Sequence, residues 1–317
     1  MSHIIIPIPE RVFEYQLPRL LILLNGGDGH DAVEIDISRV KFLTPAAAVA
    51  LLARWHRWRA SGVQVSLGGL DQCGSLGYLQ RMDFLRHLGI EHPENFTRHP
   101  AGNRFVPIQS LNFASGDVDE IASEITRCVL PDASPDDDVF LALQYAAGEL
   151  LSNAKYHSGG RAFASAQFFP SRSVVRIAVA DDGQGIRRSF VATSREHEAE
   201  TPDAAIRLAL QPGVSSALLR PQLNLYGGQN HRGVGLSITR ILAKEAQGQL
   251  TMATESGWFD EIQGIEQPRP RGEIYFPGTL VAVCLHRDHI ADYAAMHDAA
   301  MAEIGMGGLD TGDIFLD

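Results

Sequence analysis

The first hundred residues alternate between a strand-like and a helix-like hydrophobic pattern. Apolar and polar residues alternate over AVEIDIS (residues 32–38), which predicts a half-buried strand. A helix is expected to begin near Pro45, because proline suits a first turn, and to run to Gly62. Residues 63–67 alternate again, and residues 77–90 have helical spacing. The pattern predicts a β-α-β-α unit.

A second unit follows a stretch of weak periodicity. Residues 91–116 are rich in Pro, Asn, His and Arg and are interpreted as a linker. Beyond it we expect helices at 118–128, 138–157, 202–210 and from a glycine-rich turn at Gly233 to Gln247, with strands at 161–169, 173–180, near Leu250 and at 279–285. The predicted divisions are an N-terminal unit with its linker (1–110), a second α/β unit (111–287) and an acidic C-terminal helix and tail (288–317).

The helix expected at 138–157 has an unusual polar side. An apolar stripe at three- and four-residue steps should face a core. A second row, spaced by four, carries Tyr145, Glu149, Asn153 and His157. A Glu and an Asn four residues apart are more often part of a solvated face, and a histidine at a helix end is more often simply polar. Further motifs are needed before this row indicates chemistry.

Two glycine motifs and a shorter element supply that context. VADDGQGI (179–186) puts Asp181 where a strand gives way to a turn, and a carboxylate there could accept a hydrogen bond from an exocyclic amine, which adenine has and guanine lacks at that position. HRGVGLSI (231–238) opens a helix, where backbone N–H groups can approach phosphate oxygens. PGT (277–279) begins the last strand. Taken singly, these are more often a tight turn or connection.

Together and in this order, the motifs resemble the GHKL superfamily, the ATP-binding fold of gyrase, histidine kinases and anti-sigma-factor kinases. ELLSNAKYH is similar to its N box, DDGQGI and GVGL to its two glycine boxes, and PGT to its last element. The resemblance implies a Bergerat α/β sandwich, with a mixed sheet covered by helices on one face. It also implies ATP and Mg²⁺ as ligands, and a lid between Arg187 and His231.

The resemblance also implies roles for single residues. Glu149 would be the catalytic residue, as general base or as the group that orients water. Asn153 would bind Mg²⁺, since an amide oxygen is a hard ligand. Asp181 would hold adenine with support from Thr279, and the pocket would be shaped by Gly183, Gly185, Gly233 and Gly235.

The N-terminal unit is similar to STAS domains, the fold of anti-sigma-factor antagonists. The resemblance lies in IDISRVKFLTPAAAVALL and YLQRMDFLRHLGI. Where such antagonists carry a phosphorylated serine, this chain has Thr44 before Pro45, and Thr44 is expected to cap the helix. The unit is therefore interpreted as a degenerate antagonist that binds a partner.

Composition narrows the class of function. The 317 residues carry a formal net charge of −11, which argues against binding to nucleic acid or to anionic membranes. The three cysteines are widely spaced and are expected to pack as free thiols. The run LPRLLILL is too short to span a bilayer and lacks a signal-peptide layout, which predicts a cytoplasmic protein.

Two functions remain open. In the first, the chain is an ATPase or a protein serine/threonine kinase of the GHKL type. In the second, it is a non-catalytic switch in which ATP changes what the STAS-like surface holds. Both involve a protein partner and both allow a homodimer. The tail from 288 onward is read as a solvated end, with docking on a partner as the alternative.

Overall fold

The computed structural model describes residues 2–111, 118–191, 193, 195–212, 214 and 235–290. The N-terminal half of this mixed α/β protein contains β1 (His3–Pro7), β2 (Arg11–Val12), α1 (Leu17–Asn25), β3 (Ala32–Asp36), β4 (Phe42–Leu43), α2 (Pro45–Ala60), β5 (Gln64–Gly68), α3 (Leu76–Arg81), α4 (Phe84–Leu88) and β6 (Phe105–Ser110). The C-terminal half contains α5 (Val118–Val129), α6 (Asp138–Ser152), β7 (Ala162–Phe169), β8 (Val174–Asp181), α7 (Ile186–Ser189), α8 (Pro202–Ala209), α9 (Gly235–Glu245), β9 (Gln249–Glu255), β10 (Gly257–Ile262), β11 (Ile265–Glu266) and β12 (Phe276–His286).

The N-terminal strands form a small parallel sheet in the order β1-β3-β5, and β2 pairs with β4 beside it. The strand predicted at 32–38 and the helix predicted from Pro45 are confirmed as β3 and α2. The Thr44 hydroxyl accepts a hydrogen bond from the Ala47 N–H at 3.4 Å, so the predicted cap is also confirmed. The helical stretch at 77–90 is broken into α3 and α4 at Asp83, which adopts a left-handed conformation with φ of 59°.

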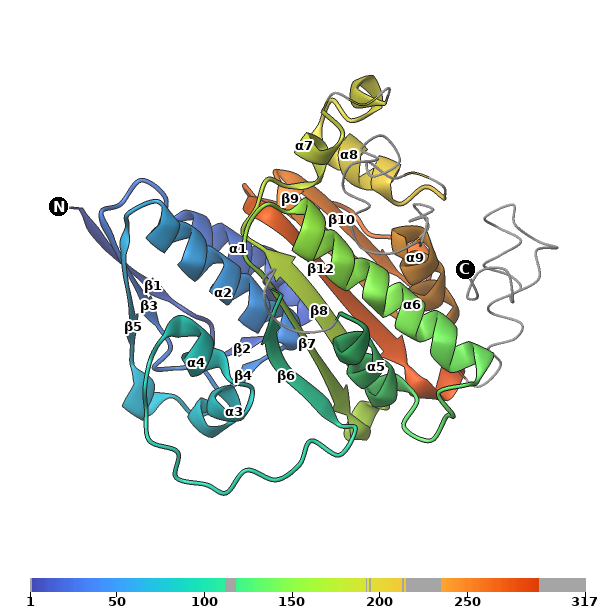
Figure 1. The fold of residues 1–317 in the computed structure, drawn as a ribbon. Helices are drawn as coiled ribbons and strands as arrows, with labels where there is room; N and C mark the ends of the chain where they lie inside the picture. The colour runs from blue at the N-terminus through green and yellow to red at the C-terminus, as the bar shows by residue number, and fades with distance from the viewer. Residues whose placement is uncertain are drawn as a thin grey trace.

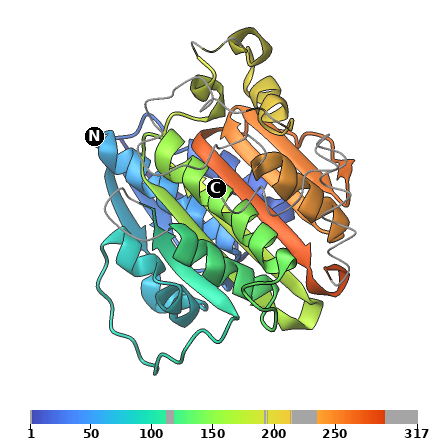
Figure 2. The same cartoon turned by 45° about the vertical axis from the view of Figure 1, so that its right-hand side comes forward.

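The C-terminal strands form a seven-stranded sheet in the order β11-β10-β9-β12-β8-β7-β6. Neighbouring strands all run antiparallel among the described residues, so the expectation of a mixed sheet is wrong. The expected linker at 91–116 is also wrong in part, because residues 105–110 form the edge strand β6 of this sheet. α5, α6 and α9 lie side by side across one face (Figures 1 and 2).

The other face of this sheet is covered by the N-terminal unit, contrary to the expectation that helices cover one face only. α2 packs against β7, β8 and β12. Side chains alternate between faces along β8, with Ala178 and Ala180 in the core shared with α2 and Val179 in the core under α6. The small alanines of α2 and β8 allow this close approach. One hydrophobic core therefore joins the N-terminal unit to the back of the large sheet.

Two further sequence predictions can be compared with the fold. The three cysteines are free and buried, which confirms their expected packing role. Within the described residues, no helix has the length and apolar character needed to cross a bilayer.

Candidate functional site

A pocket opens between α6 and the sheet, and we call it the α6 pocket. It is lined by side chains from α6, β8, α7, α8, α9, β9 and β12. The predicted site residues that line it are Glu149, Asn153, Asp181, Gly185, Gly235 and Thr279. Segments far apart in the sequence thus bring two carboxyl groups, an amide and a hydroxyl to one cavity.

The helix predicted at 138–157 supplies the first wall. α6 ends at Ser152 and continues directly into a π-helical turn at Asn153–His157. Such turns widen a helix locally and are frequent at functional sites. The apolar residues Leu150 and Ala154 are buried in the core, while the Glu149 side chain is 9% exposed and Asn153 is half-buried. The side chain of His157 lies outside the described residues.

Asp181 is the most strongly perturbed group in the pocket. It is the last residue of β8, is 3% exposed, and its Oδ1 accepts a hydrogen bond from the Gly183 N–H at 2.9 Å. Burial raises the pKa of this carboxyl to about 7, although hydrogen bonds from Gly183 and from the backbone and hydroxyl of Thr279 favour the ionised form. A buried carboxyl with a perturbed pKa in a cleft is typical of a functional site.

Close backbone approach explains two of the pocket glycines. A Cβ at Gly235 would lie 2.3 Å from the Cβ of Glu149, so only glycine allows the start of α9 to touch α6. Gly185 has φ of +77°, and a Cβ there would lie 2.8 Å from the Thr254 hydroxyl. Gly233 lies outside the described residues.

Gly183 occupies a wall behind the pocket and does not line it. A Cβ at Gly183 would lie 2.1 Å from the carbonyl oxygen of Ser158, and a Cβ at Gly160 would lie 2.8 Å from the Gly183 nitrogen. The Gln184 N–H donates to the same Ser158 carbonyl at 2.8 Å. The 158–160 and 182–184 segments therefore stack backbone to backbone as a thin partition.

Another wall of the pocket comes from the segment between Gly185 and Gly235. Phe190, Ala209 and Val214 line the pocket and belong to a small separate core. Sequence reasoning missed them, because only long-range packing brings them to the cavity. It also missed Ser158 and Met252, for which the sequence contains no motif.

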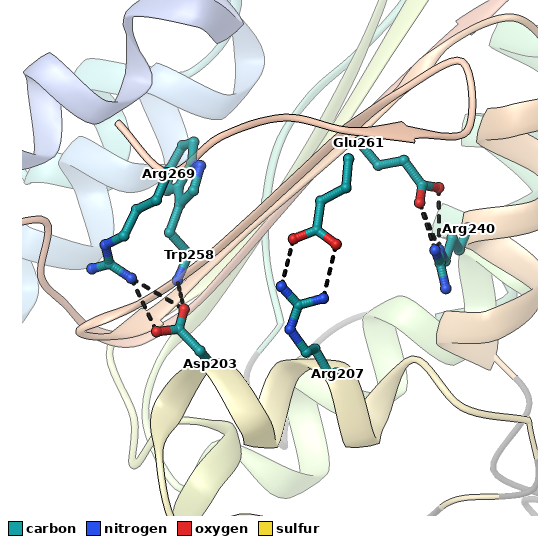
Figure 3. Close-up of polar contacts among 7 residues, drawn as sticks. Asp203, Arg207, Arg240, Trp258, Glu261 and Arg269 are labelled. Carbon is teal, nitrogen blue, oxygen red and sulfur yellow. Dashed lines mark hydrogen bonds and ion pairs between the residues drawn. The ribbon is translucent and has the colours of Figure 1, made fainter. Parts of the chain in front are cut away.

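α8 is fastened to the edge of the large sheet (Figure 3). Asp203 accepts hydrogen bonds from the Trp258 backbone N–H at 2.9 Å and from Arg269 Nη1 at 3.1 Å. Arg207 forms two hydrogen bonds to Glu266, at 2.8 and 2.5 Å. The expected lid between Arg187 and His231 therefore contains a helix that is clamped onto β10 and β11, which no sequence motif indicated.

A polar contact ties α2 to the partition behind the pocket. Arg57 Nη1 donates to the Asp182 carbonyl at 3.3 Å, and Asp182 Oδ1 accepts from the Arg161 N–H at 2.6 Å. Arg161 also donates to His56 Nδ1. The N-terminal unit thus reaches the residue next to Asp181.

The histidine in this contact is neutral. His56 Nε2 donates to the His87 carbonyl at 2.9 Å, which leaves Nδ1 as the acceptor for Arg161. Burial lowers the pKa of His56 to about 4, with neighbouring Arg161 acting in the same direction. The neutral His56 ring therefore orients the Arg161 guanidinium group without adding a charge of its own.

Comparison with known proteins gave no relative. No protein-family model matches the chain, and neither the curated proteins nor the solved structures contain a match. The function is therefore inferred from the residues of the pocket and their geometry.

Proposed function

We propose that the α6 pocket binds Mg-ATP and that the chain is a GHKL-type regulator that hydrolyses ATP or transfers its phosphoryl group to a protein serine or threonine. In this proposal the N-terminal unit is a STAS-like domain that binds a protein partner. The observation that carries it is the meeting of Glu149, Asn153 and Asp181 in one pocket. In a GHKL-type site Glu149 would activate water, Asn153 would bind the metal ion and Asp181 would bind the adenine base.

Asp181 fits the adenine end of the site. Its buried carboxyl would accept a hydrogen bond from the exocyclic amine of adenine. Guanine has a carbonyl at that position, so a deprotonated Asp181 would face an acceptor with no donor between them. Thr279, whose hydroxyl and backbone bond to Asp181, would hold the carboxyl in place.

Asn153 and Glu149 fit the phosphate end. The Asn153 amide oxygen would complete a magnesium shell formed otherwise by phosphate oxygens and water. Bound Mg-ATP would supply the electrophilic phosphoryl group and the charge neutralisation for its transfer. Glu149 would orient a water or hydroxyl nucleophile and take up its proton. α9 begins at Gly235 beside Glu149, so its N-terminal end would face the phosphates.

The size of the pocket adds a requirement. Its volume is about 110 Å³, whereas sites for small molecules typically have roughly 300–1,000 Å³. Binding of a nucleotide would therefore require the pocket to widen, and we propose that the wall at Phe190, Ala209 and Val214 moves outward. The clamp on α8 restrains that movement.

Calorimetry with Mg²⁺ and either ATP or GTP tests the proposal. We expect ATP to bind and GTP to bind at least about tenfold more weakly, because a hydrogen bond from the base to a buried carboxylate is worth more than about 1.4 kcal/mol. Asn153→Ala should weaken Mg-ATP binding. Glu149→Ala should keep binding and lose ADP formation, and Gln144→Ala on the same helix is the matched control. Equal affinity for ATP and GTP would refute the adenine site.

The second candidate is the non-catalytic switch. It is supported by the contact of Arg57 in α2 with Asp182, one residue from Asp181, which gives the N-terminal unit a route to the pocket. Under this alternative the protein binds Mg-ATP but forms no ADP, and its oligomeric state or partner capture differs between ATP and ADP. If the wild type forms ADP and Glu149→Ala does not, the chain is an enzyme and the non-catalytic switch is ruled out.

A further inference from the structure

A second hollow lies behind the partition, between the last turn of α2 and the glycine segments. Its volume is about 870 Å³, much larger than that of the α6 pocket. Four arginines line it, namely Arg57, Arg59, Arg161 and Arg188, and we call it the arginine cleft. In a chain of net charge −11, such a concentration of guanidinium groups is a local feature and does not reflect a basic protein.

None of these four guanidinium groups forms an ion pair with a carboxylate in the described residues. Arg57 contacts a backbone carbonyl, and Arg161 contacts the neutral ring of His56. Arg59 and Arg188 are exposed, and their guanidinium groups make no hydrogen bond or ion pair within the part of the chain that the structure describes. Of the two acids in the lining, Glu255 is paired with Arg187, outside the cleft, at 3.0 Å. The other, Asp182, accepts a hydrogen bond from the Arg161 backbone N–H and lies near the charges of Arg57 and Arg161, so it offsets part of their charge.

We propose that the arginine cleft binds a phosphoryl group. Guanidinium groups present planar forks of N–H donors that match the oxygens of a phosphate, and several together suit a dianion better than a single carboxylate. Arg57 and Arg161 are held in place by Asp182 and His56, while Arg59 and Arg188 have donors to offer. The shared ligand chemistry is a phosphate monoester or free phosphate.

The cleft is coupled to the α6 pocket through the partition. Ser158 lines both cavities, and Asp182 and Gly183 line the cleft directly behind Asp181. An anion bound to Arg57 and Arg161 changes the contacts of these arginines with Asp182. It thereby shifts Asp181, the preceding residue in the chain. This step depends on the proposed nucleotide site, and by linkage the two ligands must change each other's affinity by the same factor.

The experiment titrates sodium phosphate into the full chain by calorimetry at constant ionic strength. The double variant Arg59→Ala/Arg188→Ala should bind phosphate about tenfold more weakly, because charge-assisted hydrogen bonds are lost. Arg19→Ala/Arg39→Ala removes the same charge from exposed positions elsewhere and should bind like the wild type. Equal binding by the wild type and the cleft double variant would overturn the site.

Asn153→Ala separates the two sites. If phosphate still binds this variant and its binding is lost in Arg59→Ala/Arg188→Ala, the anion lies in the cleft, and the cleft stands whether or not the chain binds ATP. Loss of phosphate binding in Asn153→Ala would overturn the cleft. N-acetyl-phosphoserine amide distinguishes the sources. Tighter binding than free phosphate identifies a phosphorylated side chain, and weaker binding identifies the free ion.

The coupling has its own readout. Phosphate should change the Mg-ATP dissociation constant of the wild type by about threefold or more and leave that of Arg59→Ala/Arg188→Ala unchanged. An unchanged constant in the wild type, with phosphate bound, would overturn the coupling alone.

Discussion

Asp181 and Asp182 are adjacent in the chain, yet they line opposite sides of one partition. Asp181 lines the α6 pocket, and Asp182 lines the arginine cleft. Burial raises the pKa of both carboxyls, but Asp182 receives the Arg161 N–H and lies near the charges of Arg161 and Arg57, which favour its ionised form. The partition thus separates a buried carboxyl that faces the α6 pocket from one whose charge is balanced by two arginines of the cleft.

Asp181→Asn should stabilise the ligand-free protein above pH 7. An unfolded Asp181 loses its proton near pH 3.8, whereas the folded protein keeps it to about pH 7, so folding stability falls as the pH rises between these values. Asn has no proton to lose and can still accept from Gly183. The free energy of unfolding of the variant, relative to that of the wild type, should therefore rise by on the order of 3 kcal/mol between pH 4 and pH 8.

Urea unfolding at the two pH values measures this gain. A stability difference between variant and wild type that is the same at pH 4 and pH 8 would contradict the buried carboxyl.

His56→Gln should flatten the acid dependence of stability. The ring takes up a proton near pH 6.5 in the unfolded chain but only near pH 4 in the folded protein. The folded state is therefore fully favoured above pH 6.5 and loses stability as the pH falls to about 4, by on the order of 2 kcal/mol. Glutamine keeps a donor and an acceptor without titrating.

Thermal unfolding between pH 7 and pH 4 checks this prediction, with the exposed His3→Gln as the control. If His56→Gln loses as much stability as the wild type over this range, the neutral His56 contact with Arg161 is not responsible.

Gly235→Ala should damage the pocket in spite of the higher helix propensity of alanine. The new methyl group would lie 2.3 Å from the Cβ of Glu149, so α9 or α6 must shift. Overpacking of this kind typically costs about 1–3 kcal/mol. Gly148→Ala is the matched control, because a Cβ there meets only Ala122, at 4.0 Å, and alanine gains up to about 1 kcal/mol in a helix.

Chemical denaturation should order these proteins as Gly148→Ala, wild type and Gly235→Ala, from most to least stable. A Gly235→Ala protein with wild-type stability and nucleotide affinity would show that α9 does not contact α6 as described.

Asp203→Ala should release α8 from the sheet. The substitution removes the hydrogen bonds from the Trp258 N–H and from Arg269. If the contact of α8 with the sheet is weakened by about 1.5 kcal/mol, the fraction of molecules in which α8 is detached rises by about tenfold. Trypsin cleavage after Arg207 should rise by the same factor. Glu198→Ala, which breaks an exposed pair with Arg195, should leave that cleavage rate unchanged.

Strongly periodic segments were predictable from the sequence. α2, α6, β3 and β8 each combine a clear apolar period with a start or stop signal, so local pattern and fold agree. β6 was missed because Pro107 interrupts its pattern. The structure explains the proline, since β6 is an edge strand with an irregular register between Val106 and Gln109.

The site was predictable only where motifs contain it. Glu149, Asn153 and Asp181 stand in recognisable runs and do meet in one pocket. The wall at Phe190 and the contact between Arg161 and His56, 105 positions apart, depend on tertiary packing that leaves no local pattern. The coverage of the sheet by α2 was missed for the same reason.

The placement of α2 against the back of the large sheet has a consequence for genetics. A disruptive substitution in that helix, which does not line the α6 pocket, would expose Phe163, Ala178 and Leu280 together. Loss-of-function mutations should therefore occur in both halves of the gene. The C-terminal half expressed alone would expose the apolar face of the sheet that α2 covers, and another protein would have to cover that face.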